Sequence, residues 1–406
     1  MLTIAEYSVG NKLSSPGRET NPLLLQLSLA VPTYSSVLPN NRIIMESALT
    51  LKPLFTPANL GAIKIANRIV MSPLTRSRAD AKGVPAPFAA TYYAQRATAG
   101  LIVSEMTQIS HEGMGYARTP GIHQAAQVER WMPITEGVHK AGGKIVLQLG
   151  HVGRIASALN RPVAADVVSA SAVKAPGQMY TDSHQMVDHD TPRALATDEI
   201  TRIAHDYANA AVNAIKAGFD GVEFHSANGY LPQQFLSTNV NQRTDKYGGS
   251  IANRIRMPLE ALAAIIDKIG ADRVGIRVSP GHTFNGIEET DAADLYAAYY
   301  AELDKLGLAY LHVMRPFMNA VNIDPVVEAR KIYRGKLIAA SGYDGETAAA
   351  LVQAGGADAV AFGRAYIANP DLVARFRASL AIAKPDDATF YTPGEKGYTD
   401  YPALAA

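Results

Sequence analysis

The residues Gly221–Tyr230 gather several side chains that can exchange protons and hydrogen bonds within one short segment. The segment reads G-V-E-F-H-S-A-N-G-Y, a short apolar strand followed by His225, Asn228 and Tyr230. His225 and Asn228 can together hydrogen-bond one oxygen of a ligand, and the phenol of Tyr230 can supply a proton nearby. The alternative interpretation is structural, with a buried histidine and a packed tyrosine at the end of a strand.

A segment of this kind needs neighbouring strands that end at the same edge, and the rest of the chain supplies them. From residue 47 onward, short continuous apolar runs alternate with stretches of helical periodicity. The predicted strands are 68–72, 101–104, 144–149, 222–224, 274–278, 310–313, 336–340 and 359–362. A set of eight strand–helix pairs predicts an α/β fold, a single (β/α)8 TIM barrel, whose active site lies at the carboxyl ends of the strands.

The predicted helices follow the strands one by one. They are 88–98, 128–141, 197–217, 258–269, 291–306, 326–333, 345–354 and 371–380. The third has the clearest apolar stripe, including Ile200, Ile203 and Tyr207, and we expect Thr197 to cap it. Thr290 is the expected cap of the helix that starts at Asp291.

Three segments depart from the strand–helix alternation. Residues 1–46 are aperiodic and interrupted by prolines, which predicts a disordered or non-native extension before a barrel of residues 47–406. Met45 is a plausible start of translation, and a targeting extension is the alternative. The long loop Val152–Ala196 follows the third strand, so it would lie on the catalytic rim as a lid. The shorter insertion Leu231–Ile255 follows the fourth strand.

The composition excludes several classes of partner. The net charge is +1 without a visible basic face, so we expect no nucleic acid partner. No apolar run approaches ~18 residues, so we expect no membrane partner either. The chain has no cysteine, which excludes thiolate chemistry and iron–sulfur clusters, and fits a cytoplasmic location. No metal-ligand spacing suggests zinc, so no metal site is expected.

The remaining strand ends carry side chains suited to a flat, phosphorylated ligand. Glycines and an arginine after the seventh and eighth strands are typical of a barrel phosphate site. Gln148 offers a donor and an acceptor, and Arg277 a fixed positive fork, which together suit a heterocycle with imide edges. The residues at these ends are Thr75, Met106, Gln148 with His151, Arg277, Arg315, Ser341 with Gly342, and Gly363 with Arg364. Each alone is equally compatible with a structural salt bridge or a surface residue.

Several strings on these strand ends resemble the Old Yellow Enzyme family of flavin-dependent ene-reductases, over about residues 47–404. The strings are M-S-P-L-T-R at 71–76, Q-L-G-H-V-G-R at 148–154, V-E-F-H-S-A-N-G-Y-L at 222–231, R-T-D-K-Y-G-G-S at 243–250 and F-G-R at 362–364. The resemblance implies a noncovalent FMN on the barrel rim, with NADPH or NADH as the reductant. It implies reduction of the activated C=C bond of α,β-unsaturated carbonyl or nitro compounds, by hydride transfer from flavin N5. The protein would act as a monomer or homodimer.

The resemblance also implies roles for individual residues. His225 and Asn228 would bind the substrate oxygen, Tyr230 would donate the proton, and Tyr391 would line the substrate pocket. The flavin ring would lie against Pro73, Thr75, Met106, Gln148 and Arg277. The phosphate would be held by Ser341, Gly342, Gly363 and Arg364.

The chain departs from the family pattern at two positions. Met106 stands beside the flavin where a small residue is usual, and we expect it to crowd the ring or alter its surroundings. Gly150 stands where many members have tryptophan, which we expect to open the substrate pocket. Two other functions remain open at this stage. One is a redox-inactive flavoprotein, and the other is a flavin-free barrel isomerase of phosphorylated sugars.

Overall fold

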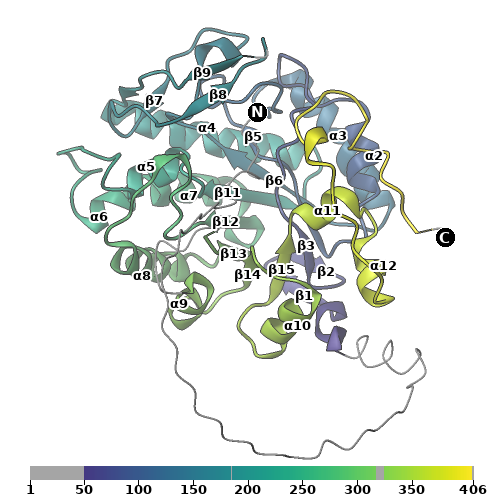
Figure 1. Cartoon of the computed structure of the whole chain (residues 1–406). Coiled ribbons are helices and arrows are strands. Elements are labelled where there is room, and N and C mark those ends of the chain that lie inside the picture. Colours follow the sequence, from purple (N-terminus) through teal and green to yellow (C-terminus); the bar gives the residue numbers. More distant parts are fainter. Residues whose placement is uncertain (1–49, 184, 317–323, 405–406) are drawn as a thin grey trace, which may run out of the picture.

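The centre of the computed structural model is a closed ring of parallel strands (Figure 1). The structure describes residues 50–183, 185–316 and 324–404, so the expectation for residues 1–46 falls outside it. Each strand of the ring pairs with the next, and the last pairs with the first. The strands are β3 (Ile69–Met71), β4 (Leu101–Val103), β6 (Ile145–Gly150), β11 (Gly221–Ser226), β12 (Val274–Val278), β13 (Tyr310–Met314), β14 (Leu337–Ala340) and β15 (Ala359–Phe362). The predicted TIM barrel is confirmed.

The strands read as continuous apolar runs because both of their faces are buried. In β4, Leu101 and Val103 belong to the apolar cluster inside the barrel, whereas Ile102 belongs to the larger cluster shared with the helices. The hairpin of β1 (Ala58–Leu60) and β2 (Ile63–Ile65) contributes to the inner cluster. Its Ala62 N–H donates to the carbonyl of Asp272, just before β12, so the hairpin covers the amino-terminal end of the barrel.

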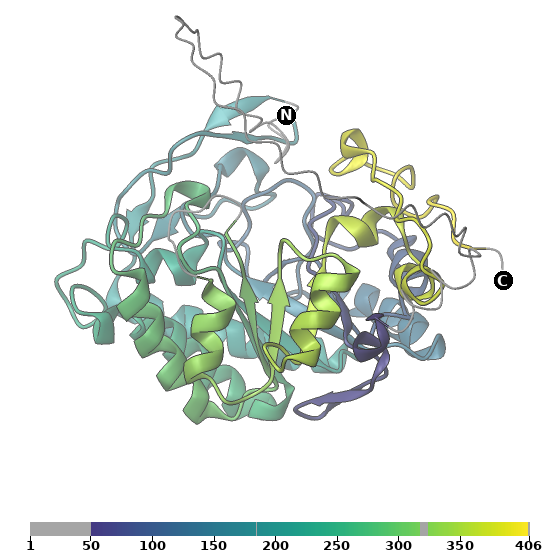
Figure 2. The same ribbon diagram turned by 60° about the horizontal axis from the view of Figure 1, so that its bottom comes forward.

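Helices lie on the outer side of the strands in both views (Figures 1 and 2). They are α2 (Ala89–Ala94), α3 (Ala125–Lys140), α4 (Thr197–Lys216), α7 (Arg256–Ile269), α8 (Ala292–Leu303), α9 (Pro325–Ile332), α10 (Gly345–Gln353) and α12 (Leu372–Arg377). The stripe predicted for α4 is confirmed, since Ile200, Ile203 and Tyr207 are buried. Within the described ranges, no helix combines the length and apolar character needed to cross a membrane.

The structure corrects three helix boundaries. The helix predicted over 88–98 ends at Ala94, because the N–H groups of Arg96, Ala97 and Ala99 bond three residues back and the Arg96 side chain donates to the Tyr92 carbonyl. The cap of α4 is Ala196 rather than Thr197, because the Glu199 carboxylate accepts the Ala196 N–H at 2.8 Å.

The third correction concerns α8. Its cap is Asp291 rather than Thr290, and the helix begins one residue later than predicted, at Ala292. Asp291 has non-helical backbone angles, and its carboxylate is held in an ion pair with Arg254. The cap is therefore placed by a tertiary contact.

The two insertions lie on the side of the barrel away from the β1–β2 hairpin (Figure 2). The first contains the antiparallel hairpin of β8 (Gln178–Tyr180) and β9 (Met186–Asp188) and the parallel pair β7 (Val168–Ser169) and β10 (Arg193–Ala194). The second contains α5 (Leu231–Leu236) and α6 (Ile251–Arg254). Two further short elements follow strands of the ring, β5 (Thr107–Gln108) after β4 and α11 (Arg364–Ala368) after β15.

Candidate functional site

Strand register brings five polar side chains together inside the carboxyl end of the barrel. Gln148 on β6 pairs with Glu223 on β11. His225 on β11 pairs with Arg277 on β12, which pairs with His312 on β13. All five are buried, with between 0% and 7% of each residue exposed. Because side chains alternate along a strand, Glu223 and His225 face the same side.

Glu223 is the centre of a buried hydrogen-bond network. Its carboxylate accepts from Gln148 Nε2 at 2.8 Å and from His312 Nδ1 at 2.9 Å. Burial alone would raise the pKa of Glu223, but His312, Arg277 and Gln148 hold it below its ordinary value. Burial lowers the pKa of His312, so the pair consists of a carboxylate and a neutral imidazole.

Among the described residues, no oxygen accepts a hydrogen bond from the guanidinium of Arg277. One terminal nitrogen donates to the thioether sulfur of Met314 at 3.2 Å, and Nε has no partner among the described residues. Burial lowers the pKa of Arg277, and the nearby Glu223 opposes that shift. A buried guanidinium with unused donors is suited to a ligand edge that carries or develops negative charge.

His225 near the end of β11 and Asn228 just after it present unpaired polar atoms among the described residues. His225 Nδ1 and Asn228 Oδ1 are buried without a partner within the described part of the chain. Burial, and then the charge of Arg277, lower the pKa of His225 to about 3, so its imidazole is neutral at physiological pH. The backbone of Asn228 has a positive φ of 59°, and two hydrogen bonds hold it in this conformation. Its N–H donates to Ser279 Oγ at 2.9 Å, and its carbonyl accepts from Asn285 Nδ2 at 2.8 Å.

Tyr230 lies beside His225, with ring centroids 5.3 Å apart. Its hydroxyl donates to the hydroxyl of Tyr116 at 3.3 Å. Burial, and then Tyr116, raise the pKa of Tyr230 well above its ordinary value, so the phenol is protonated at neutral pH. Tyr391, which is 40% exposed, also raises the pKa of Tyr230.

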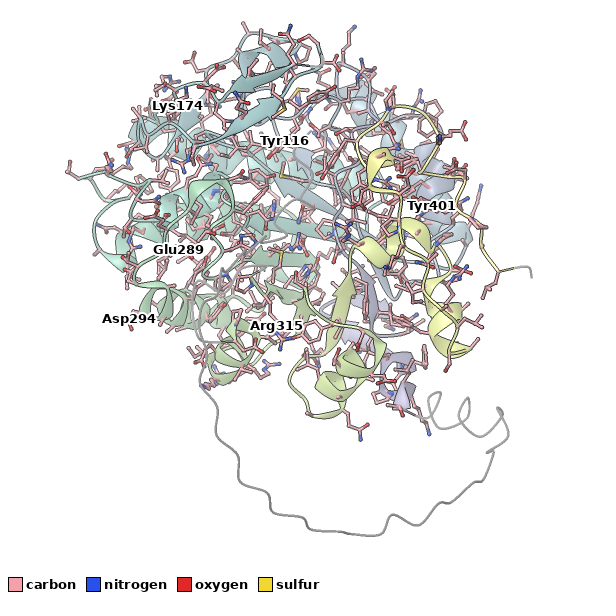
Figure 3. All side chains as sticks on the ribbon, viewed as in Figure 1. Tyr116, Lys174, Glu289, Asp294, Arg315 and Tyr401 are labelled. Carbon is pink, nitrogen blue, oxygen red and sulfur yellow. The ribbon has the colours of Figure 1, made fainter. Side chains whose placement is uncertain are left out.

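Tyr116 comes from the loop after β5 and is labelled in Figure 3. It packs with Tyr230 against an apolar cluster that includes Met179 of β8. The cluster therefore joins the long loop after β6 to the same mouth of the barrel, in agreement with the expected lid position.

The ends of β14 and β15 form an open, glycine-rich rim. Ser341 and Gly342 have φ of 72° and 78°, and a Cβ added to Gly342 would meet no atom within 4 Å. A Cβ added to Gly363 would lie 3.5 Å from Cδ2 of Leu74, so the segment with Pro73 and Thr75 adjoins β15. The Arg364 side chain is 52% exposed and forms an ion pair with Asp387 at 2.6 Å.

Met106 and Gly150, the two residues that depart from the family pattern, are in contact. A Cβ added to Gly150 would lie 2.4 Å from both Cγ and Sδ of Met106. Met106 is only 6% exposed and belongs to the cluster against which Tyr116 and Tyr230 pack. The space at Gly150 is therefore filled by Met106, and the expectation that Gly150 opens the pocket is wrong.

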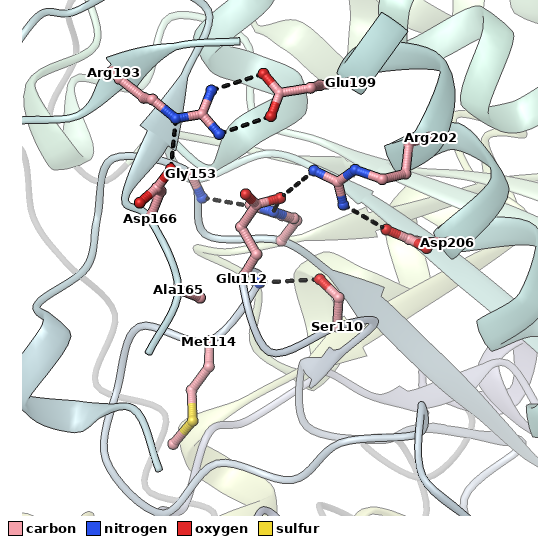
Figure 4. Close-up of polar contacts among 12 residues, drawn as sticks. Ser110, Glu112, Met114, Gly153, Ala165, Asp166, Arg193, Glu199, Arg202 and Asp206 are labelled. Carbon is pink, nitrogen blue, oxygen red and sulfur yellow. Dashed lines mark hydrogen bonds and ion pairs between the residues drawn. The ribbon is translucent and has the colours of Figure 1, made fainter. Parts of the chain in front are cut away.

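Two strand-end residues point elsewhere. The His151 ring is fully buried, with Nδ1 accepting from the Gly153 N–H at 3.1 Å and Nε2 3.7 Å from Glu112. Glu112 also pairs with Arg202 of α4 at 2.8 Å, which ties the loop after β5 to that helix (Figure 4). Arg315 pairs with Asp324 and stacks over Tyr343.

Sequence reasoning assigned no role to Glu223, His312 or Tyr116. Glu223 had a usable signal, since a carboxylate two residues before His225 on a strand must share its face. His312 had a weaker one, as the histidine within a predicted apolar strand. Tyr116 lies in a loop without periodicity, and only the fold brings it to Tyr230.

Comparison with known proteins agrees with this geometry. The family model described as NADH:flavin oxidoreductase / NADH oxidase matches residues 53–382. The chain is 42% identical to 12-oxophytodienoate reductase 1 of Oryza sativa subsp. japonica, covering 87% of this chain and 93% of that protein. It is 44% identical to a probable flavin mononucleotide-dependent alkene reductase of Leishmania infantum, covering 87% of this chain and 97% of that protein.

Solved structures give the same result. Morphinone reductase in complex with tetrahydroNAD superposes with a TM-score of 0.82 at 45% identity, covering 87% of this chain and 98% of that one. The old yellow enzyme homologue from Zymomonas mobilis superposes with a TM-score of 0.84 at 42% identity, covering 86% and 99%. The chain belongs to the Old Yellow Enzyme family of FMN-dependent oxidoreductases.

Proposed function

We propose that this protein reduces the activated C=C bond of α,β-unsaturated carbonyl or nitro compounds, using NADPH or NADH. The observation that carries the proposal is His225, whose buried Nδ1 has no partner among the described residues, beside the protonated phenol of Tyr230. The side-chain amide of Asn228, three residues after His225, can donate to the same ligand oxygen through Nδ2. A protein that only stores flavin needs none of these three groups. The relative named as an alkene reductase supports the same class of reaction. The cysteine-free composition supports a cytoplasmic location.

The residues at the barrel mouth fit an FMN molecule. When bound, FMN would supply hydride transfer between the nicotinamide and the β-carbon of the alkene. Gln148 and Arg277 would offer buried donors to the pyrimidine edge of the ring, and Pro73, Thr75 and Met106 would adjoin it. Ser341, Gly342, Gly363 and Arg364 would hold the phosphate, with open space at Gly342 to receive it.

His225 and Asn228 would orient the substrate by its oxygen. Because His225 is neutral, it binds that oxygen through a hydrogen bond rather than through a full positive charge. A donor that polarises the carbonyl draws electrons away from the β-carbon, which favours hydride attack there. Arg277, the register partner of His225 on β12, would supply a fixed positive charge at the flavin edge. Tyr391 would line the outer wall of this pocket.

Tyr230 would protonate the α-carbon. Its raised pKa keeps the proton on the phenol until a strong base, the developing carbanion, is in contact with it. The hydrogen bond to Tyr116 fixes the hydroxyl direction. The phenol takes no part in hydride transfer from the nicotinamide, so the two half-reactions should depend on it differently.

Replacing Tyr230 separates the two half-reactions. Tyr230→Phe keeps the ring and its packing but removes the proton. We expect flavin reduction by NADPH to stay close to the wild-type rate, and flavin reoxidation by cyclohexenone to slow by roughly 10²-fold. Stopped-flow absorbance of the flavin measures both rates. Equal slowing of the two half-reactions, or full enone turnover by the variant, would mean that Tyr230 is not the proton donor.

A further inference from the structure

The side chain of Met106 fills the space that a side chain at position 150 would occupy. Gly150 ends β6, and Met106 stands three residues after the end of β4, the neighbouring strand in the ring. The 2.4 Å approach of an added Cβ involves Cγ and Sδ of Met106, which are interior atoms of that side chain. Any side chain larger than hydrogen at position 150 therefore requires Met106 to move.

The shared space faces the ligand side of the barrel. Gln148 and Gly150 are two residues apart on β6, so a side chain at position 150 would point to the same side as Gln148. Gln148 points into the barrel toward Glu223, at 2.8 Å. Position 150 lies one step nearer the mouth, where Tyr230 and Tyr116 pack against the cluster that contains Met106.

We propose that Met106 is the specificity-determining wall of the substrate pocket, in place of a side chain at position 150. This inference rests on the proposed reduction of activated alkenes. Methionine is unbranched and flexible, so this wall can yield to a bulky β-substituent more readily than a rigid ring fixed on β6. The substrates that it favours are enones with an extended or aromatic group at the β-carbon.

The experiment measures how the ratio of kcat/KM for a bulky enone, 4-phenylbut-3-en-2-one, to that for cyclohexenone depends on both positions. Met106→Ala should raise this ratio by about 10-fold, because several methylene-sized groups leave the wall. Gly150→Leu added to Met106→Ala should return the ratio toward the wild-type value, because the leucine refills the same space. Gly150→Leu alone should lower the melting temperature and the FMN content, and Met106→Ala should restore both.

Matched controls separate this role from general packing. Met179→Ala removes the same side chain from the same apolar cluster, away from Gly150, and should leave the ratio unchanged. Met106→Val is a milder second variant, which should raise the ratio in the same direction if Met106→Ala loses its flavin. An unchanged ratio in both Met106 variants, or no reversal by Gly150→Leu, would overturn the proposal.

Failure of the proposed function gives a different result. In that case the wild-type protein would turn over neither enone. The melting temperature and FMN content of the single and double variants would still test whether Met106 and a side chain at position 150 compete for the same space. Additive effects of the two substitutions on those two quantities would overturn it.

Discussion

Within the described part of the chain, the charge of Arg277 is balanced by the buried carboxylate of Glu223. Arg277 and Glu223 lie on adjacent strands, and each shifts the pKa of the other. An uncompensated charge inside a barrel is costly, so Glu223 allows the guanidinium to remain buried beside the proposed flavin site. The same carboxylate reduces the positive potential that a ligand at Arg277 would feel. Glu223 is thus a positioning residue for Gln148 and a regulator of the charge of Arg277.

Neutralising Glu223 should therefore make the bound flavin easier to reduce. Glu223→Gln keeps the size and the acceptor for Gln148 but removes the negative charge. We expect the midpoint potential of the flavin to rise by tens of millivolts, since about 30 mV corresponds to roughly 1.4 kcal/mol for a two-electron couple. Spectroelectrochemical or dye-coupled titration measures the shift.

A control for this variant is the partly buried carboxylate of Glu260 on α7. Glu260→Gln on α7 removes a charge that pairs with the Tyr247 hydroxyl at 2.7 Å, outside the barrel interior. The midpoint potential of the flavin bound to the Glu260→Gln variant should equal that of the wild type. If the flavin midpoint potential of the Glu223→Gln variant is equal to or below the wild-type value, the proposed electrostatic role of Glu223 is wrong.

At the scale of elements, the sequence predicts strand ends well and contacts between loops poorly. Each strand is an apolar run whose position follows from burial on both faces, so Gln148, His225 and Arg277 were located at the correct ends before the fold was known. The bond between Tyr230 and Tyr116 joins two loops more than a hundred residues apart, and no local pattern encodes it. The filling of the space beside Gly150 by the Met106 side chain depends on how side chains from two adjacent strands point, which the sequence of either strand alone does not encode.

The ion pair between Arg364 and Asp387 is another contact of this kind. Arg364 begins α11, and Asp387 belongs to the segment after α12. If Arg364 holds the FMN phosphate, Arg364→Ala should weaken FMN retention by roughly 10-fold or more, since a hydrogen bond to a charged group contributes about 1.5–3 kcal/mol. Equilibrium dialysis or flavin fluorescence during dilution measures the loss.

Asp387→Asn distinguishes a phosphate role from a purely structural one. It breaks the same ion pair but leaves Arg364 charged, so FMN retention should stay equal to the wild type or improve. Equal losses of FMN in the Arg364 and Asp387 variants would indicate that the ion pair supports the local fold and that Arg364 does not bind the phosphate.

At the scale of the whole molecule, arginines after β3 hold the C-terminal segment. Arg76 donates to the carbonyls of Phe390 and Gly397 at 3.1 and 2.7 Å, and Arg78 to those of Thr389 and Lys396 at 2.9 and 3.0 Å. The segment that carries Tyr391 is therefore fixed to the first strand of the ring. The barrel closes between β15 and β3, which pair in parallel through Val360 with Ile69, Ala361 with Val70 and Phe362 with Met71.

This closure bears on the first 44 residues, which lie outside the described part of the chain. We expect a protein that starts at Met45 to keep its FMN content and its melting temperature, because the omitted residues are aperiodic and interrupted by prolines. Differential scanning fluorimetry and flavin absorbance of the two lengths test this. A large loss of either property would show that the extension packs on the barrel.

The buried carboxyl of Glu105 gives the closure a pH dependence. Glu105 accepts the Arg76 N–H at 3.3 Å, and burial raises its pKa to about 7, against the opposing effect of Arg76 and Arg78. An acid whose pKa is higher in the folded than in the unfolded state holds its proton more tightly when folded. Its contribution to stability is complete below the unfolded pKa of about 4.3, and is lost as the pH rises through about 7.

Glu105→Gln isolates this contribution from those of other titrating groups. The glutamine keeps an acceptor for the Arg76 N–H and stays neutral at every pH. We therefore expect the free energy of unfolding of the variant, relative to the wild type, to increase by on the order of 2–3 kcal/mol between pH 5 and pH 8. Urea unfolding of both proteins at several pH values measures the difference. Parallel pH profiles would mean that Glu105 titrates in the folded protein as it does in the unfolded chain, and that its carboxyl does not weaken the contact between the segment after β3 and the C-terminal segment at high pH.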